Sequence, residues 1–250
     1  MKRLKRLMPL ALVILVWSIG SCFLNQLFLP TPQRVFNTLI DMAKSGLLQE
    51  AAVASLIRIT IASLIAAFIS IPLALIVANY RLADDLITPV TGFMRYIPVT
   101  VFYPLLIIWL GIDEGMKITF LFMAMFFAFL PNIVLMVKGI DKELIDTAYT
   151  IGMSKLEIIF RVQLPFVIPN ICQSFLMIFS VGWTYVVIAE VVNAKSGLGH
   201  IMNIGSARGR TDIVFVGIIT IFVISFVFDN LGGFIIKKLF PWKFARQIKQ

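Results

Sequence analysis

Long apolar runs separated by short polar segments make up most of this chain. A membrane-spanning helix needs about 20 mostly apolar residues. Six stretches meet that length: residues 7–29, 53–80, 87–112, 118–137, 166–192 and 213–236. The third and fifth stretches are long, which indicates tilting or a re-entrant part. The pattern therefore predicts an all-α, polytopic membrane protein with about six transmembrane helices.

Composition agrees with this pattern. The 250 residues are 60% hydrophobic and 14% charged, whereas a soluble domain is nearer half apolar and a quarter charged. The net charge of +9 is also typical of a nucleic-acid binder, but such a protein would not be this apolar. A membrane protein with basic cytoplasmic loops accounts for both facts.

The distribution of basic residues predicts the orientation in the membrane. With the N-terminus inside, 14 of the 22 Lys and Arg residues lie in inner segments and six in outer segments. This bias places both termini, and the polar segment 141–165, in the cytoplasm. No linker or repeat divides the chain, so we expect one transmembrane domain, 1–250. Residues 1–50 would hold the first helix and an outer segment, and residues 51–238 a five-helix core.

The polar segment DKELIDTAYTIGMSKLEIIFRVQLP (141–165) predicts two short helices at the inner membrane surface. Asp141 is suited to cap the first helix, and Gly152 to end it, because glycine tolerates positive φ. Ser154 and Glu157 have the spacing of a capping box, which would start the second helix. Because such short helices are marginal in water, we expect them to pack on the membrane helices and on a cytoplasmic partner.

This segment resembles the EAA loop of ABC-importer permeases, in which Glu-Ala-Ala is followed by three residues, Gly, nine residues and Ile-x-Leu-Pro. Here Asp-Thr-Ala stands at the first position, and the spacing to Gly and to Val-Gln-Leu-Pro is kept. Asp for Glu and Thr for Ala are mild departures. The resemblance implies these ATPase-coupling residues, with Ser154 as the cap: Asp146, Thr147, Ala148, Gly152, Ser154, Leu164 and Pro165.

The resemblance extends over most of the chain and is closest to the nitrate/sulfonate/taurine/bicarbonate-type permeases. The similar segments are LPTPQRV (29–35), SLIR (55–58), RYIPVTVFYPL (95–105), WLGIDEGMKI (109–118) and AEVVNAKSGLGHIM (189–202). Ser63 and Ala67 stand where such proteins often carry glycine. The resemblance implies an inner-membrane permease that moves a small anion or a vitamin precursor. It also implies these partners: ATP-binding cassette ATPase subunits, an extracytoplasmic binding protein, a second copy of the chain, and lipid.

The chain lacks the residues needed to hydrolyse ATP itself. No G-x-x-x-x-G-K-[ST] phosphate loop occurs anywhere in it. We therefore expect no cofactor on this chain, and ATP with Mg²⁺ on a partner ATPase. Its two cysteines lie in apolar runs and it has one histidine, so no metal site is expected.

Charged residues inside membrane spans are costly and usually face a bundle interior or a cavity. Four such charges form two pairs of opposite sign at similar depth, Arg58 with Glu190 and Arg95 with Asp229. Each is either a structural ion pair or part of a gate or solute contact. Polar-tipped residues add three further candidates to the predicted path, for which ordinary packing is the alternative: Tyr103, Trp183 and Thr184.

Two other classes of protein remain open at this point. A membrane-embedded lipid-diphosphate transferase would need two acidic clusters to hold Mg²⁺, and Asp84-Asp85 is the one cluster on the inner side, since Asp113-Glu114 lies on the other. A stand-alone channel or secondary carrier is not excluded by composition. ATP-independent transport by the chain alone would favour that class.

Overall fold

The computed structural model describes residues 2–94, 96–192 and 194–244. The chain divides into two compact units. The first unit holds Met1–Leu56 and Glu190–Ile224, and the second holds Ile57–Ala189 and Ser225–Gln250. Every described element is a helix or a turn, with no strand among the described residues, which confirms the all-α prediction.

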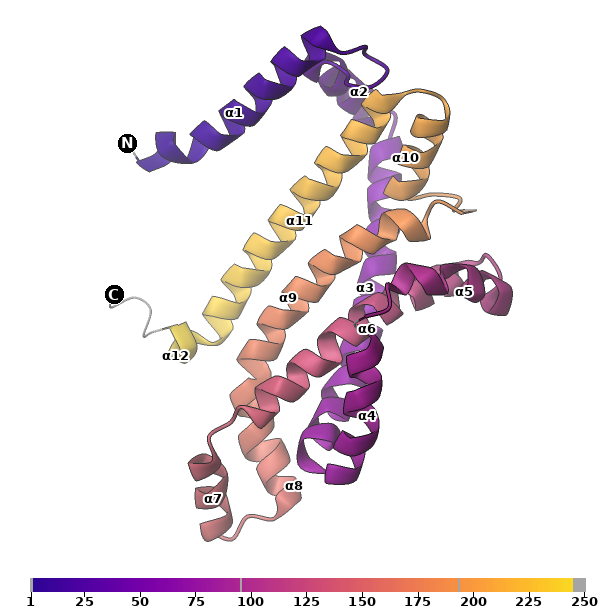
Figure 1. The fold of residues 1–250 in the computed structure, drawn as a ribbon. Coiled ribbons are helices and arrows are strands. Elements are labelled where there is room, and N and C mark those ends of the chain that lie inside the picture. Colours follow the sequence, from indigo (N-terminus) through magenta and orange to yellow (C-terminus); the bar gives the residue numbers. More distant parts are fainter. Residues whose placement is uncertain (1, 95, 193, 245–250) are drawn as a thin grey trace. The chain divides into compact units, whose positions relative to one another are not determined.

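The first unit combines the N-terminal stretch of the chain with a later stretch that holds α10 and the start of α11 (Figure 1). Its elements are α1 (Lys2–Phe23), α2 (Pro32–Lys44), the start of α3 (Leu47–Asn79), α10 (Leu198–Ala207) and the first part of α11 (Thr211–Leu239). Trp17 holds α1 against the rest of this unit. Its indole N–H donates to the Pro30 carbonyl over 2.9 Å, and its ring stacks on Phe215 of α11.

Helix α2 lies in what the sequence suggested was a plain outer segment. Thr31 caps it by accepting a hydrogen bond from the Arg34 N–H over 3.3 Å, and Pro32 opens the first turn. Proline suits this position because its missing N–H would have no helical partner there. Buried side chains recur at helical spacing along α2: Val35, Thr38 and Met42.

The second unit contains the remaining elements. They are the rest of α3, α4 (Arg81–Met94), η1 (Val99–Phe102), α5 (Tyr103–Leu110), α6 (Glu114–Lys138), α7 (Lys142–Thr150), α8 (Lys155–Glu157), η2 (Ile158–Gln163), α9 (Leu164–Ala189), the end of α11 and α12 (Pro241–Phe244). Helices α6 and α9 form its centre. Gly182 of α9 allows close approach, since a side chain there would collide with Met125 of α6 and Ile59 of α3.

Four helices are long and apolar enough to cross a membrane within the described residues: Leu47–Asn79, Glu114–Lys138, Lys155–Ala189 and Thr211–Leu239. They match four of the six predicted spans. The third predicted span, 87–112, is instead divided into Arg81–Met94 and Val99–Leu110, which diverge by 91°. The first predicted span, 7–29, corresponds to α1. The described apolar part of that helix, Leu12–Phe23, is shorter than a membrane span. The count of six is therefore not confirmed.

Candidate coupling site and membrane path

The predicted coupling segment folds as two short helices around a turn, as expected. The first is α7, and Asp141 occupies its N-cap position. The prediction that Asp141 caps this helix is wrong in one respect, because the Asp141 side chain makes no capping hydrogen bond. The first turn of α7 thus begins without the stabilisation that a capping side chain gives.

Gly152 ends α7 in the left-handed region, with a φ of +85°. The Met153 N–H donates to the Ala148 carbonyl over 3.1 Å, and the Gly152 N–H to the Tyr149 carbonyl over 3.0 Å. These two bonds are the Schellman pattern that closes a helix C-terminus. The prediction that glycine makes this turn is confirmed.

Ser154 and Glu157 form the predicted capping box. The Ser154 N–H donates to the Glu157 carboxylate over 3.0 Å, and the Ser154 hydroxyl accepts from the Glu157 N–H. The second helix does not stop before the membrane span, however. It continues through the π-helix η2 and Pro165 into α9, so that Lys155–Ala189 is one 35-residue helix.

The residues at the Glu-Ala-Ala positions lie on α7 with different exposure. Asp146 and Thr147 are exposed, whereas Ala148 is 4% exposed and packs inward. Several apolar side chains of this segment stay uncovered in the isolated chain: Leu144, Tyr149, Ile151, Leu156 and Phe160. An apolar surface of this kind, next to exposed polar groups, is typical of a protein–protein contact.

A polar clamp, which the sequence did not reveal, fastens this segment to the end of α3. Asn79 and Gln163 exchange two side-chain hydrogen bonds, of 2.7 and 3.0 Å. Lys155 donates to the Asn79 carbonyl over 2.7 Å and lies 3.9 Å from the centre of the Tyr80 ring. We call Asn79, Tyr80, Lys155 and Gln163 the α3 clamp. It joins the coupling segment to the C-terminal end of α3.

Arg58 lies in a charged cluster of the second unit, in which Arg58 and Lys117 are buried while Glu114 is about half exposed. Its guanidinium makes two hydrogen bonds, of 2.6 and 2.9 Å, to the Glu114 carboxylate. Lys117 donates to the same carboxylate over 2.9 Å and is only 2% exposed. The count of basic residues assigned Lys117 to an outer segment, and the structure shows it buried in the first turn of α6, which begins at Glu114.

Glu190 is fully buried in the first unit, where it docks α10. Its carboxylate accepts from the Ser55 hydroxyl over 2.8 Å and from the Gly199 N–H over 2.8 Å, at the positive end of α10. Gly197 has a φ of +132°, and a side chain there would collide with this carboxylate. Arg58 and Glu190 belong to different units, so their pairing stays a prediction.

Two of the three polar-tipped path candidates are packed into the second unit. Tyr103 is 8% exposed and donates to the Ala189 carbonyl over 3.2 Å, and Trp183 is 3% exposed. Thr184, one residue further along α9, is exposed instead. Packing explains the first two residues, whereas Thr184 faces outward from this chain.

Asp229 lies on an exposed polar face formed by α9 and α11. It accepts from the Ser180 hydroxyl over 3.1 Å, and with Gln173 and Lys237 it lines a groove of about 420 Å³. Thr184 follows Ser180 by one helical turn on the same side of α9. The predicted pairing of Asp229 with Arg95 stays a prediction, since Arg95 lies outside the described residues.

Within the described ranges no group of three or more His, Cys, Asp or Glu residues could hold a metal ion. The arrangement thus consists of an apolar helical bundle, a helix–turn–helix clamped to one end of it, and a polar face along two of its helices. These features define the class, which is an integral-membrane helical protein with an apolar surface left open beside exposed polar groups.

Residues 70–241 match the family model of the binding-protein-dependent transport system inner membrane component. This match covers more than half of the chain, so the chain belongs to that family. It is a multi-pass permease subunit of an ABC importer rather than an enzyme. A family of this kind works with an ATPase and with a substrate-binding protein.

Named relatives cover nearly the whole chain. The taurine transport system permease protein TauC of Escherichia coli (strain K12) is 29% identical over 93% of this chain and 87% of its own. A probable ABC transporter permease protein of Brucella abortus (strain 2308) is 31% identical over 86% of each chain. The match to TauC agrees with the nitrate/sulfonate/taurine subgroup that the sequence indicated.

A solved structure shares the fold. One chain of the MetNI methionine ABC transporter, in an inward-facing conformation, superposes with a TM-score of 0.61 at 16% identity. The alignment covers 76% of this chain and 96% of that one.

Proposed function

We propose that segment 141–165 is the site through which the partner ATPase drives this permease. The observation that carries the proposal is the pairing of an exposed Asp146 and Thr147 on α7 with the α3 clamp behind them. One side of the segment is open to a partner and the other is fixed to two membrane helices. Movement of the partner would therefore reach α3 and α9 directly.

The complex we propose contains two copies of this chain, two ATPase subunits that bind ATP and Mg²⁺, and an extracytoplasmic binding protein. Both termini of the chain lie in the cytoplasm, as the Lys and Arg distribution indicates. Lipid covers the remaining apolar surface of the spans.

The substrate we propose is a small sulfonate-type solute. The similarity to TauC over 93% of this chain supports that class. The polar face with Thr184, Ser180 and Asp229 is the proposed path, because exposed polar groups on apolar spans are costly against lipid. A second copy of the chain, set against this face, would enclose it. A vitamin precursor is the alternative substrate.

The test is reconstitution of the complex in proteoliposomes, with ATP hydrolysis and solute uptake measured together. In Asp146→Lys, charge reversal at the docking surface places like charges together, which can cost several kcal/mol. We expect co-purification with the ATPase and substrate-stimulated hydrolysis to fall at least about tenfold. Asp113→Asn, an exposed N-cap residue of α6 outside the segment, is the matched control and should leave both unchanged.

Unchanged stimulation in Asp146→Lys would exclude the coupling role of this segment. Uptake by the chain without ATP and without an ATPase would instead favour a stand-alone channel or carrier.

A further inference from the structure

An apolar groove of about 550 Å³ lies between α1 and the first part of α11, inside the first unit. Its size is within the range of about 300–1,000 Å³ that is usual for small-molecule sites. The side chains that line it are apolar or aromatic, and they include Leu12, Val13 and Val16 of α1, which stay exposed in the isolated chain. Trp17 and Phe215 line it as well, and their rings stack with 5.2 Å between the ring centres. The groove is therefore open to an apolar ligand from the membrane.

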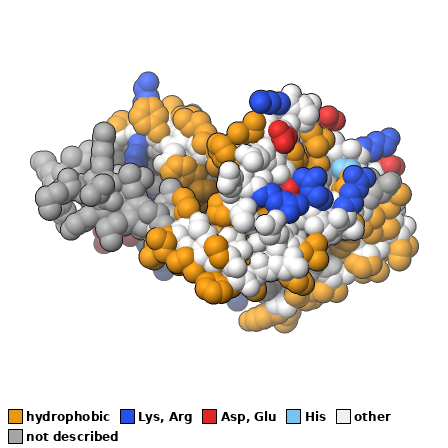
Figure 2. All heavy atoms as spheres, turned by 90° about the horizontal axis from the view of Figure 1, so that it is seen from above, with side chains coloured by type: hydrophobic (Ala, Val, Ile, Leu, Met, Phe, Trp, Pro, Cys, Tyr) orange, Lys and Arg blue, Asp and Glu red, His pale blue; other side chains and the backbone are white. Residues whose placement is uncertain are grey.

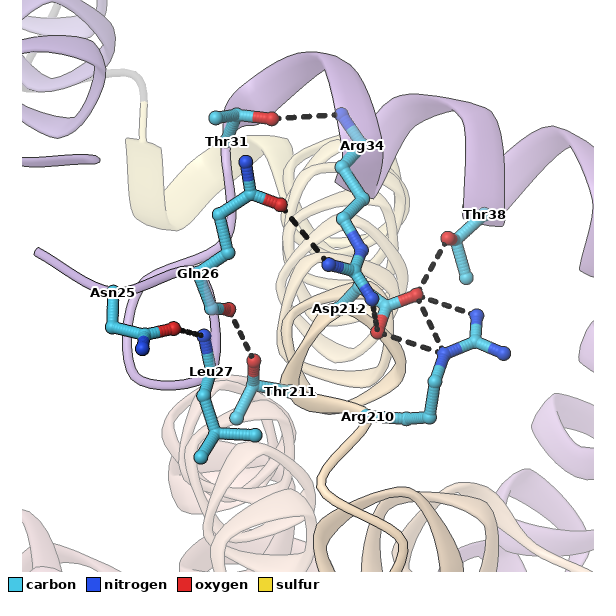
Figure 3. A network of polar contacts seen from close by, with 9 residues as sticks. All are labelled: Asn25, Gln26, Leu27, Thr31, Arg34, Thr38, Arg210, Thr211 and Asp212. Carbon is cyan, nitrogen blue, oxygen red and sulfur yellow. Dashed lines mark hydrogen bonds and ion pairs between the residues drawn. The ribbon is translucent and has the colours of Figure 1, made fainter. Parts of the chain in front are cut away.

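A charged cluster lies one helical turn along α11 from this groove. Asp212 precedes Phe215 by three residues and is buried. Arg210 holds the Asp212 carboxylate through bonds of 2.6 and 3.0 Å, and Thr38 of α2 donates to it over 2.8 Å (Figure 3). Arg34, which is also on α2, lies 3.7 Å from the same carboxylate. The first turn of α11 thus brings basic side chains next to the apolar groove.

The cluster holds two guanidinium groups and one carboxylate, which leaves one positive charge in excess. The hydrogen bonds that Arg210 donates to Asp212 raise the pKa of Arg210 above its usual value, so this guanidinium is committed to the carboxylate. The Arg34 guanidinium has the longer contact with Asp212 and one bond of 3.1 Å to Gln26, and 43% of its side chain is exposed. Basic side chains gather on the face that Figure 2 draws. Arg34 is therefore the guanidinium best placed to take a further negative charge.

An apolar groove beside an available cation has the two features that an anionic phospholipid requires. A flexible acyl chain can fill the groove by van der Waals contact, and a guanidinium binds a phosphate through charge-assisted hydrogen bonds. A second copy of the chain that met this surface through the same surface of its own would instead bring two positively charged clusters together, which opposes association. The charge thus favours a lipid as the occupant of the groove.

We propose that the groove between α1 and α11 is a binding site for an anionic phospholipid, with an acyl chain along residues 12–20 of α1 and the phosphate on Arg34. The bound lipid stabilises the packing of α1 on α11, where Trp17 and Phe215 meet. This site goes beyond the transport role and does not depend on the coupling segment, because all of its residues belong to the first unit.

The test measures the quenching of Trp17 fluorescence by brominated phospholipids in phosphatidylcholine vesicles that contain the full chain. The other three tryptophans, Trp109, Trp183 and Trp242, are first replaced by phenylalanine. We expect brominated phosphatidylglycerol to reach half-maximal quenching at an about fivefold lower mole fraction than brominated phosphatidylcholine with the same acyl chains, as for one basic residue beside an anionic headgroup. Mass spectrometry of the unaltered chain, purified in detergent with both lipids, should show phosphatidylglycerol retained in preference.

Variants of α2 then assign the lipid preference to one side chain. Arg34→Gln should abolish the about fivefold preference for phosphatidylglycerol, whereas Arg34→Lys keeps the charge and should retain most of it. Lys44→Gln removes the same charge from an exposed position of α2 that does not line the groove, so it should leave the preference unchanged.

Three results would overturn the lipid site. Equal quenching by the two lipids would exclude selection of the headgroup, and an equal loss of preference in Arg34→Gln and Lys44→Gln would show a general effect of surface charge. Absence of quenching by either lipid would mean that another partner, such as a second copy of the chain, covers the groove. None of these measurements needs an ATPase, so their failure would leave the coupling role of segment 141–165 intact.

Discussion

Gly152 has a φ of +85°, yet an added Cβ there would meet no atom within 4 Å. A substitution is therefore opposed by backbone conformation alone, which costs roughly 1–2 kcal/mol for a non-glycine residue in the left-handed region. Gly152→Val should leave membrane insertion intact while lowering ATPase co-purification and transport several-fold. Gly152→Asn should retain more of both, because asparagine enters this region more readily. Equal loss of co-purification and transport in the two variants would mean that the backbone conformation at residue 152 does not cause the loss.

Ser154 and Asp141 both occupy N-cap positions, but only Ser154 makes the capping bonds. Ser154→Ala should therefore destabilise the coupling segment by about 1 kcal/mol, whereas Asp141→Ala should change little. Hydrogen exchange of the backbone N–H groups after each cap measures the difference. Equal protection in the two variants would contradict the assignment of the capping box.

At the scale of elements, the α3 clamp connects the coupling segment to the end of α3 through polar side chains. Gln163→Leu removes both side-chain bonds to Asn79 and leaves the Asn79 side chain with only its bond to the Leu75 carbonyl. We expect ATP hydrolysis to continue while transport per ATP falls several-fold, because ATPase motion no longer reaches α3 efficiently. Measuring solute uptake and ATP hydrolysis together in the reconstituted complex gives the number of solutes transported per ATP.

A double-mutant cycle makes the clamp prediction sharper. The double variant Asn79→Ala with Gln163→Leu should lower transport per ATP little more than either substitution alone. The effects of substitutions at two residues in contact are generally not additive. Strictly additive losses would show that the two residues act separately.

The elements that the sequence predicted well are those set by local pattern. Four spans follow from apolar length, and the Gly152 turn and Ser154 capping box follow from residues at most three positions apart. The clamp could not be found this way, because Asn79 and Gln163 are 84 positions apart. The burial of Lys117 could not be predicted for a similar reason, since it depends on the fold of the second unit rather than on its neighbours in the chain.

Helix α2 was missed although its signals are local. Thr31 followed by Pro32 marks a helix start, and its buried positions recur at helical spacing. The mixed composition of this segment concealed the pattern, because Arg34, Asp41 and Lys44 stand among its apolar residues.

At the scale of the whole molecule, the orientation in the membrane can be measured with single cysteines. The native Cys22 and Cys172 would first be replaced by serine. Lys44→Cys should then react with a membrane-impermeant maleimide in intact cells, and Lys142→Cys only after permeabilisation. Labelling of Lys142→Cys in intact cells would place the coupling segment on the wrong side and exclude an ATPase contact there.

The continuous helix Lys155–Ala189 can turn a small tilt at one end into a larger displacement at the other. Its 35 residues correspond to about 52 Å at 1.5 Å per residue. The π-helical turns at Ile158–Gln163 and the prolines that follow interrupt the regular hydrogen bonds near one end, which is where such a helix bends most easily. A tilt of about 5° at that end displaces the far end by about 4–5 Å over this length. Under the coupling role that we propose, a small movement of the segment would be enlarged at the Ala189 carbonyl, which accepts a hydrogen bond from the Tyr103 hydroxyl.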